Sequence, residues 1–485
     1  MPNVDDLIKI IEEEKLNVDK DLVRKAFKFA NEAHKKEMRA NGEPYIVHPL
    51  ATAISLAKYH LDQDTIIAGI LHDVPEDTEK TLKDVEENFG KNVAKLVEGI
   101  TKLGKLKYRG IERYTENLRK MFIAMAADLR VIFIKFADRL HNLKTLDALP
   151  KAKRERIALE TLEIYAPIAN RLGIWQLKGK LEDYSFKHLY PKEYKKLQIA
   201  VEEKFSEREL LLKEIREKII KELQQEKIKF LEISGRTKDL WSLYKKMQAH
   251  DTQLDRIYDV IALRVVVESV ADCYKVLGII HSKWKPIPKR IKDYIAQPKP
   301  NGYQSLHTTV FCDRGKTVEI QIRTEEMHLT SEYGIAAHWH YDEQGSIQFE
   351  KDIEWVKDLT KLQQETKDNK QYLDSLKIDV FQNRIFVFTP KGDVIDLPED
   401  STPIDFAYHI HTEIGNKATT ARINNQIASL DTHLKSGDMV EIIIDKNRKS
   451  PNRDWLKFVK TRAARDRIKI KSKKSVWDTI KNFRK

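Results

Sequence analysis

The hydrophobic period of this chain changes part way along its length, and this change constrains the fold more than any other feature. Before about residue 230, apolar residues recur three or four positions apart, as in Leu22, Val23 and Ala26, which is the period of amphipathic helices. Beyond that point, 260–267 is rich in β-branched residues and 318–323 alternates apolar with polar residues, which is typical of strands. With 485 residues, the chain also exceeds what one hydrophobic core supports. We therefore predict a multidomain protein, with an all-α domain followed by mixed α/β and β-rich domains.

Shifts in pattern and charge divide the chain further. We predict an all-α domain, a connecting helix, a mixed α/β domain, a charged helical linker, a small β-rich module and a basic tail, at residues 1–195, 196–230, 231–345, 346–378, 379–445 and 446–485 respectively. The clearest local signal is a hairpin in the β-rich module, because the turn 390–393 separates two strand patterns.

The positive charge of the chain lies in its tail. The whole chain carries +12, whereas residues 446–485 hold 16 Lys or Arg and three Asp, so that the remaining residues sum to −1. Cations that neutralise phosphates, together with Trp455, Phe458 and Trp477 as stacking groups, indicate a nucleic-acid contact. The alternative is a solvated helix whose apolar residues dock on their own domain.

Compartment follows from the cysteines and the hydropathy. Cys273 and Cys312 are too few and too far apart for a disulfide framework or a zinc knuckle, which favours a reducing, cytoplasmic location. The sequence contains no apolar run near the ~20 residues needed to span a bilayer, and residues 1–19 do not resemble a signal peptide. We therefore expect a cytoplasmic protein that does not contact membranes.

A first cluster of candidate functional residues lies in the helical region. His72 and Asp73 are adjacent at the end of a helical run, and imidazole nitrogen together with carboxylate oxygen suits a divalent cation. His48 and Asp138 are the natural candidates to complete the protein ligands. Two histidines and two carboxylates fit manganese, with zinc as the alternative.

Two more carboxylates follow this pair. Glu76 and Asp77 come one helical turn later, on the same side of the helix end as the proposed metal. They are available to activate a water or to protonate a leaving group. An isolated His-Asp pair is more often a surface dipeptide, but the density of acidic and imidazole groups here favours an active site.

A second cluster lies in the mixed α/β region, and it combines carboxylates with basic residues, as phosphoryl transfer requires. Alternation puts Glu319, Gln321 and Arg323 on one face of a predicted strand, and Asp259 precedes another. These carboxylates suit Mg²⁺. Taken singly, each feature is weak, because an alternating strand often has one solvated face.

Cations and a restrained loop strengthen this second cluster. Arg236, Lys238 and Lys246 surround a helical stretch and could bind a triphosphate. The Pro- and Gly-restrained loop 298–309 displays Tyr303, an aromatic platform for a purine.

The helical cluster resembles a known family. The motifs at 42–49 (Gly-Glu-Pro-Tyr-Ile-Val-His-Pro), 72–77 (His-Asp-Val-Pro-Glu-Asp) and 136–142 (Phe-Ala-Asp-Arg-Leu-His-Asn) resemble the HD hydrolase domain of long Rel/SpoT-type alarmone enzymes. That resemblance implies removal of the 3′-pyrophosphate of (p)ppGpp. It further implies Mn²⁺ ligands at His48, His72, Asp73 and Asp138, catalytic acids at Glu76 and Asp77, and nucleotide contacts at Arg39, Asn142 and Thr145.

The second cluster is similar to the synthetase domain of the same family, whose fold is nucleotidyltransferase-like. Matching motifs are 235–238 (Gly-Arg-Thr-Lys), 298–309, 319–321 (Glu-Ile-Gln) and 336–339 (Ala-Ala-His-Trp). The resemblance implies that Arg236 and Arg264 sandwich the adenine of ATP, that Lys238, Ser242 and Lys246 hold its phosphates, and that Asp259 and Glu319 bind Mg²⁺, with Glu319 also as the catalytic base. It implies that Tyr303 stacks on the guanine of GDP or GTP, with Lys299, Asn301, His307 and Gln321 nearby.

The β-rich module resembles the TGS domain, a small β-grasp fold. The motifs at 387–392, 405–412 and 437–441 carry this resemblance, which implies contact with the end of deacylated tRNA through His411, with His409 second. Full-length members continue into further domains that support control by the ribosome, and this chain stops at Lys485. A histidine pair in a small β-domain is otherwise more often structural.

These observations predict a bifunctional (p)ppGpp synthetase and hydrolase with ATP, GDP or GTP, and (p)ppGpp as ligands. One alternative is a hydrolase whose synthetase domain only senses nucleotide. The other is a non-enzymatic RNA-binding regulator, which would explain the basic tail but neither cluster of candidate catalytic residues.

Overall fold

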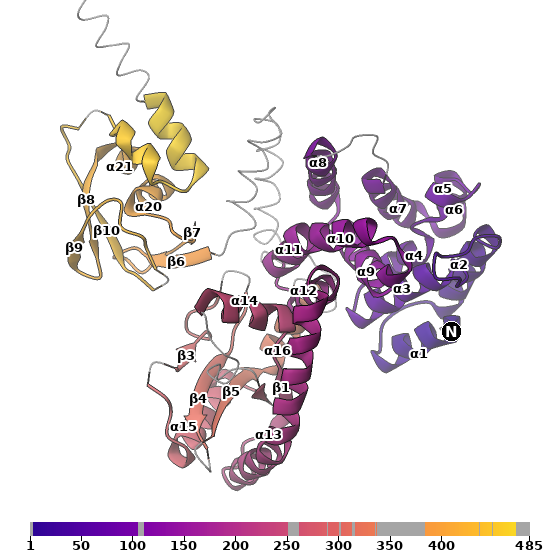
Figure 1. Cartoon of the computed structure of the whole chain (residues 1–485), viewed down its shortest axis with the longest axis horizontal. Helices are drawn as coiled ribbons and strands as arrows, with labels where there is room; N and C mark the ends of the chain where they lie inside the picture. The colour runs from indigo at the N-terminus through magenta and orange to yellow at the C-terminus, as the bar shows by residue number, and fades with distance from the viewer. Residues whose placement is uncertain are drawn as a thin grey trace, which may run out of the picture. The chain divides into compact units, whose positions relative to one another are not determined.

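The computed structural model describes residues 3–104, 111–250, 261–288, 290–299, 302–312, 316–334, 336, 384–435, 437–448 and 450–471. The chain divides into two compact units, Met1–Gln364 and Glu365–Lys485, both drawn in Figure 1. Asp259, Asn301 and the predicted linker 346–378 lie outside the described residues. Across the described ranges, no helix combines the length and the apolar character that crossing a membrane requires.

The first unit begins with helices, as the hydrophobic period predicts. Their starts follow local chemistry: Asn3 and Thr81 form capping boxes, and Asp62 accepts a hydrogen bond from a first-turn backbone N–H. These helices are α1 (Val4–Glu13), α2 (Lys20–Ala33), α3 (Val47–Lys58), α4 (Gln63–Leu71), α5 (Val74–Asp77), α6 (Leu82–Phe89), α7 (Lys91–Gly104), α8 (Ile111–Ala127), α9 (Arg130–Lys144), η1 (Leu146–Ala148), α10 (Lys151–Glu160), the π-helical η2 (Thr161–Tyr165) and α11 (Ala166–Arg171).

Two further helices lead to the sheet. α12 (Trp175–Leu189) packs on the helical domain, yet its Phe186 belongs to the hydrophobic core that covers the sheet. α13 (Pro191–Gln225) is one continuous helix. Relative to the predicted range 196–230, it begins and ends five residues earlier, because Pro191 suits the first turn and a strand already starts at Phe230.

A mixed sheet of five described strands follows, in the order β1-β2-β5-β4-β3. The β2–β5 pair is parallel and the other pairs are antiparallel. The elements are β1 (Phe230–Thr237), α14 (Leu240–His250), β2 (Ile261–Val267), α15 (Val270–Lys283), β3 (Lys292–Asp293), β4 (Leu306–Phe311), β5 (Thr317–Thr324) and α16 (Glu325–Tyr333). The predicted strands at 260–267 and 318–323 are thus confirmed over the described residues, and β5 is the central strand.

The sheet separates a hydrophobic face from a polar one. Val265 and Ile320 belong to the core formed with α13 and α15. The intervening residues of β5, including Glu319 and Arg323, point to the opposite face, where α16 contacts β2 and β5. Alternation along β5 therefore produces the predicted polar surface.

Close packing joins the helical and sheet domains within the first unit. The carboxylate of Asp183, on α12, accepts hydrogen bonds from the backbone N–H groups of Leu240 and Trp241 at 3.1 and 2.9 Å, and so caps the N-terminus of α14. Gly334 ends α16 with φ +58°, and a Cβ there would collide with the backbone at Leu172. The two domains therefore meet backbone to backbone.

The second unit contains two small sheets, β10-β8-β9 and the hairpin β6-β7, in keeping with the predicted β-grasp module. Its elements are β6 (Arg384–Phe388), β7 (Val394–Pro398), α20 (Pro403–Ile410), α21 (Thr412–Lys417), β8 (Ala418–Ile423), β9 (Gln426–Ala428), β10 (Val440–Ile444) and η6 (Arg453–Lys457). The start of the basic tail docks on this unit: Trp455, Val459 and Ile468 are buried in its core. For residues 450–471 the structure thus shows the docked alternative.

Candidate active sites

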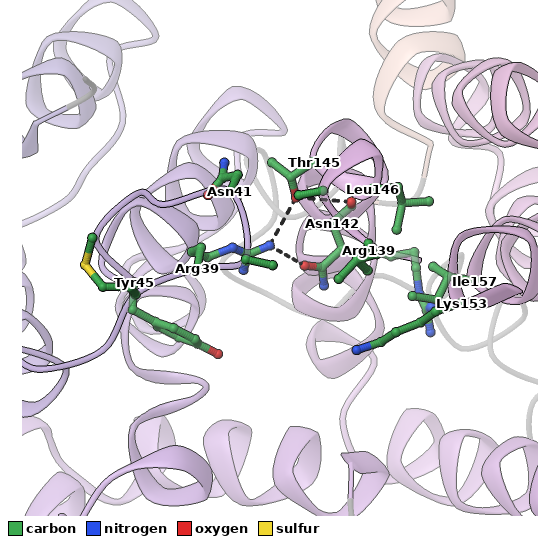
Figure 2. A pocket seen from close by; sticks show the side chains of 13 residues that line it. Arg39, Asn41, Tyr45, Arg139, Asn142, Thr145, Leu146, Lys153 and Ile157 are labelled. Carbon is green, nitrogen blue, oxygen red and sulfur yellow. Dashed lines mark hydrogen bonds between the residues drawn. The ribbon is translucent and has the colours of Figure 1, made fainter. Parts of the chain in front are cut away.

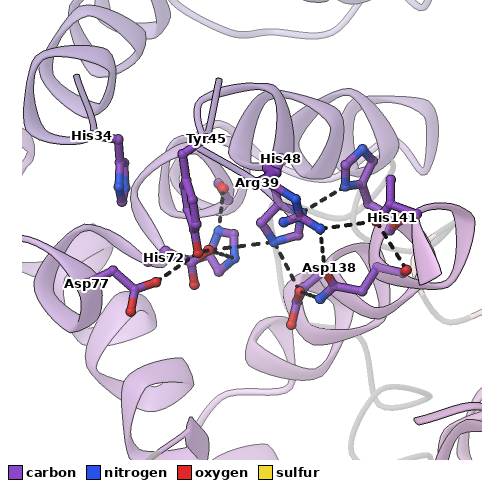
Figure 3. A network of polar contacts seen from close by, with 12 residues as sticks. His34, Arg39, Tyr45, His48, His72, Asp77, Asp138 and His141 are labelled. Atoms are coloured by element: carbon purple, nitrogen blue, oxygen red, sulfur yellow. Dashed lines mark hydrogen bonds and ion pairs between the residues drawn. The ribbon is translucent and has the colours of Figure 1, made fainter. Parts of the chain in front are cut away.

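Four residues from three segments of the helical domain meet at one point. His48 lies in the first turn of α3, His72 and Asp73 between α4 and α5, and Asp138 on α9. His48 Nε2 is 3.2 Å from Asp138 Oδ1 and 3.5 Å from Asp73 Oδ2, and His72 Nε2 is 3.1 Å from the same Asp73 oxygen. Figure 3 shows the two imidazoles and Asp138 converging. The predicted ligand set is therefore assembled.

The hydrogen bonds of the histidines leave their inner nitrogens available as ligands. His72 Nδ1 lies 2.9 Å from the carbonyl oxygen of Gly69, to which it must donate, so Nε2 is the nitrogen that can bind a metal ion once its proton is displaced. This Nε2 is buried, has no hydrogen-bond partner among the described residues, and faces a carboxylate oxygen. His48 and His72, with Asp138, offer ligand atoms within 4.8 Å of one another.

Electrostatics favour a cation at this point. Although burial opposes the charged form, Asp73 and Asp138 raise the pKa of His72 to about 9. A proton on Nε2 would satisfy one contact, whereas a divalent cation would satisfy both imidazoles and both carboxylates at once. The donor set therefore fits a divalent metal ion.

Two residues that sequence reasoning missed support this cluster. His141 Nδ1 lies 2.9 Å from His48 Nδ1, and burial lowers the pKa of His141 to about 3, so neutral His141 can accept the proton of His48. Lys135 Nζ lies 2.6 Å from Asp138 Oδ2 and balances its charge. Both belong to α9 and lie one helical turn from Asp138. In the sequence, this spacing is what could have indicated that they support the cluster.

Tyr45 links the metal-type cluster to a candidate catalytic acid. Its hydroxyl is 3.0 Å from Asp73 Oδ2 and 2.8 Å from Asp77 Oδ2, so it lies between the two carboxylates. The ring stacks on His34 at 4.6 Å, and His34 is fixed by Glu37 at 2.9 Å. The structure therefore brings Asp77 to the edge of the cluster, whereas Glu76 lies half-buried on the same short helix.

The predicted nucleotide contacts adjoin the cluster. Arg39 Nη2 donates to Asn142 Oδ1 at 2.9 Å and to Thr145 Oγ1 at 3.1 Å, and Asn142 in turn donates to Asp138. Figure 2 shows Arg39, Asn142 and Thr145 among the residues that line a cavity. The volume of this cavity is about 360 Å³. Arg139 and Lys153 also line it, which adds cations that suit a phosphorylated ligand.

Strand register builds the second site. Gln321 pairs with Arg264 across the parallel ladder and with His307 across the antiparallel one, so the three lie in one row on the polar face. Gln321 Nε2 donates to Glu319 Oε1 at 2.8 Å, and His307 Nδ1 lies 3.4 Å from the same oxygen. Arg236 donates to Gln321 at 3.3 Å. Glu319 is therefore at the centre of the predicted residues.

An arginine pair lies beside this row. Arg264 and Arg323 share the carboxylate of Glu332, on α16, at 3.2 and 3.1 Å. Arg323 is fully buried, and burial followed by repulsion from Arg264 lowers its pKa to about 10. Two of its nitrogens lack a hydrogen-bond partner in the described part of the chain.

The remaining predicted contacts are placed as follows. Lys238, Ser242 and Lys246 lie before and on α14, where Ser242 approaches Glu182 of α12 at 3.5 Å. Tyr303 is buried, and its hydroxyl is 2.8 Å from His307 Nε2. In the second unit, His409 and His411 are exposed at the end of α20.

Comparison of the chain with family models identifies three matching regions. Residues 26–175 match the family model of the HD domain, 235–346 a region found in RelA/SpoT proteins, and 385–444 the TGS domain.

Curated relatives match nearly the whole chain. The chain is 48% identical to a probable guanosine-3′,5′-bis(diphosphate) 3′-pyrophosphohydrolase of Synechocystis over 94% of its length and 61% of that protein. It is 46% identical to a GTP pyrophosphokinase of Myxococcus xanthus (93% and 60%) and to the bifunctional (p)ppGpp synthase/hydrolase SpoT of Escherichia coli (92% and 64%). The chain thus spans about three fifths of the length of these relatives.

Proposed function

The chain belongs to the RelA/SpoT family, and from this premise we propose that it is a bifunctional alarmone enzyme. It transfers pyrophosphate from ATP to the 3′-hydroxyl of GDP or GTP, and it hydrolyses (p)ppGpp to GDP or GTP and pyrophosphate. The observation that carries this proposal is that one compact unit holds both a buried His-Asp cluster fit for a divalent metal and a polar sheet row centred on Glu319.

At the hydrolase site, His48, His72, Asp73 and Asp138 would hold Mn²⁺. The bound cation supplies Lewis acidity toward the phosphate ester. Asp77, held by the Tyr45 hydroxyl, moves a proton to or from the attacking water or leaving group, and Glu76 assists. Arg39, Asn142 and Thr145 orient the nucleotide at the adjoining cavity.

At the synthetase site, Glu319 takes the proton of the acceptor 3′-hydroxyl and, with Asp259, would hold Mg²⁺. Arg236 and Arg264 flank the adenine, while Lys238, Ser242 and Lys246 bind the triphosphate. Gln321 and His307 fix the Glu319 carboxylate through contacts at 2.8 and 3.4 Å. Tyr303, with Lys299 and Asn301, receives the guanine of the acceptor.

The second unit would contact deacylated tRNA, and through it the ribosome. Support comes from the match to the TGS domain and from the exposure of His409 and His411. We place the protein in the cytoplasm, because Cys273 and Cys312 are both free thiols.

One experiment tests both activities. Purified protein is incubated with Mn²⁺ and radiolabelled ppGpp in one tube, and with Mg²⁺, ATP and GDP in another, and the products are separated by thin-layer chromatography. We expect pyrophosphate release in the first and ppGpp in the second. A silent second tube would support a nucleotide-sensing pseudo-synthetase, and silence in both would support an RNA-binding regulator.

Tyr45→Phe should slow hydrolysis without affecting synthesis. The variant keeps the stacking ring but loses the hydroxyl between Asp73 and Asp77, so kcat for ppGpp hydrolysis is expected to fall about tenfold, as for other groups that orient metal ligands. Tyr59→Phe is the matched control, because the Tyr59 hydroxyl is buried with no hydrogen-bond partner among the described residues. Equal kcat values for the two variants would show that Tyr45 orients neither carboxylate.

A further inference from the structure

The ammonium of Lys299 lies inside a cage of three aromatic rings. Its Nζ is 4.6 Å from the ring centre of Tyr294, 4.8 Å from that of Tyr303 and 5.2 Å from that of Trp175. All three distances fall within the ~6 Å over which an aromatic face attracts a cation. Proteins use such cages to bind cationic ligands, and here the ligand is a side chain of the same chain.

The cage covers Tyr303. Tyr303 is only 5% exposed: Lys299 lies over its ring, Trp175 and Tyr294 make T-shaped contacts with centroids 5.6 and 6.0 Å away, and His307 lies at its hydroxyl end. Neither face of Tyr303 is therefore open to a purine in this conformation. An acceptor base could stack there only after a neighbour has moved, and Lys299 has the longest and most flexible side chain among those neighbours.

One wall of the cage comes from outside the synthetase domain. Trp175 is the first residue of α12, and the backbone just before it is held by the close approach of Gly334. The Trp175 indole N–H is buried and has no hydrogen-bond partner in the described ranges. Lys178 lies 5.3 Å from the centre of the same ring, so the indole stabilises two cations.

We propose that Trp175 is a positioning residue of the acceptor-nucleotide site. Together with Tyr294 and Tyr303, it holds Lys299 over Tyr303 in the unliganded protein. The acceptor base stacks on Tyr303 when Lys299 leaves the cage and turns toward the nucleotide phosphates. This inference rests on the proposed synthetase function, and it adds a residue of the helical domain to the synthetase site.

The electrostatics of Lys299 fit this role. Burial, followed by repulsion from Lys292 and Lys178, lowers the pKa of Lys299 to about 8. Incoming phosphates would favour its charged form more strongly than the rings do, because a full negative charge attracts an ammonium more than a ring quadrupole does. Nucleotide binding thus supplies the attraction that empties the cage.

Trp175→Leu tests the cage through kinetics. Loss of one ring weakens the hold on Lys299, so we expect the KM for GDP to fall about two- to fivefold while the KM for ATP stays unchanged. Trp175→Phe restores an aromatic face and should return the KM for GDP toward the original value. A KM for GDP that is unchanged or higher in Trp175→Leu, or equal shifts in both KM values, would overturn the proposal.

A second measurement does not depend on turnover. In protein labelled with ¹³C at the lysine ε-carbon, ring currents should shift the Lys299 signal upfield, with Lys299→Arg identifying it, and GDP with a non-hydrolysable ATP analogue should remove the shift. If product forms but the Lys299 signal of the unsubstituted protein is unshifted, the cage is wrong and the proposed function stands. If the shift is present and responds to GDP but no product forms, the proposed synthetase activity is wrong and the cage stands.

Discussion

Asp73→Asn is expected to abolish ppGpp hydrolysis while leaving synthesis from ATP and GDP intact. The Asp73 carboxylate approaches both His72 and His48, so the amide removes a negative charge at the point where the metal ligands converge. We expect kcat to fall at least about 10³-fold, which corresponds to about 4 kcal/mol of activation free energy. The measurement is pyrophosphate release from labelled ppGpp across a Mn²⁺ titration.

The titration separates two causes of that loss. Partial recovery at high Mn²⁺ would indicate weakened metal binding, and no recovery would indicate a metal held in the wrong place. Glu79→Gln, an exposed carboxylate just beyond Asp77, is the matched control for the loss of one charge. Hydrolysis by Asp73→Asn within tenfold of the original rate would refute the ligand assignment.

Glu319→Gln should have the opposite effect, with synthesis lost and hydrolysis retained. The amide keeps the shape of the side chain on β5 but can neither accept the 3′-hydroxyl proton nor supply charge to Mg²⁺. We expect the rate of ppGpp formation to fall about 10³- to 10⁴-fold. Initial rates with ATP and GDP, alongside hydrolysis of added ppGpp, provide the readout.

Glu326→Gln controls for the loss of a carboxylate near the same strand, because Glu326 is exposed on the first turn of α16. If both activities fall together in Glu319→Gln, the defect is in folding rather than in chemistry. If synthesis survives, another group is the base and the central position of Glu319 in the sheet row has no catalytic meaning.

Local pattern predicted the elements where one physical signal dominates. The strand β5 covers the alternating run 318–323, and the hairpin β6-β7 forms around the predicted turn. The strand β1 was not predicted, because Phe230–Thr237 lacks regular alternation. This strand is stabilised by its pairing with β2, which contains a bulge. Propensity thus sufficed for isolated elements and not for an edge strand.

In the candidate sites, too, local patterns predicted some residues and missed others. Residue types and motifs predicted the metal-type ligands and the polar face of β5, and the structure brings these residues together. Tyr45 and Trp175 could not be found that way, because their roles arise from contacts with Asp77 and Lys299, far along the chain. Such contacts depend on how helices pack, which a single sequence does not encode in any local pattern.

The shared helix α12 limits where this chain can be divided into fragments that fold on their own. It supplies Asp183 to cap α14, and its Phe186 packs against Tyr194, Trp241 and Tyr244. The HD family match ends at residue 175, so a gene split at that boundary would assign α12 to the second fragment and leave the first without the helix that covers α10 and α11. We therefore expect a fragment that ends at residue 175 to expose the surfaces of α10 and α11 that α12 covers in the whole chain.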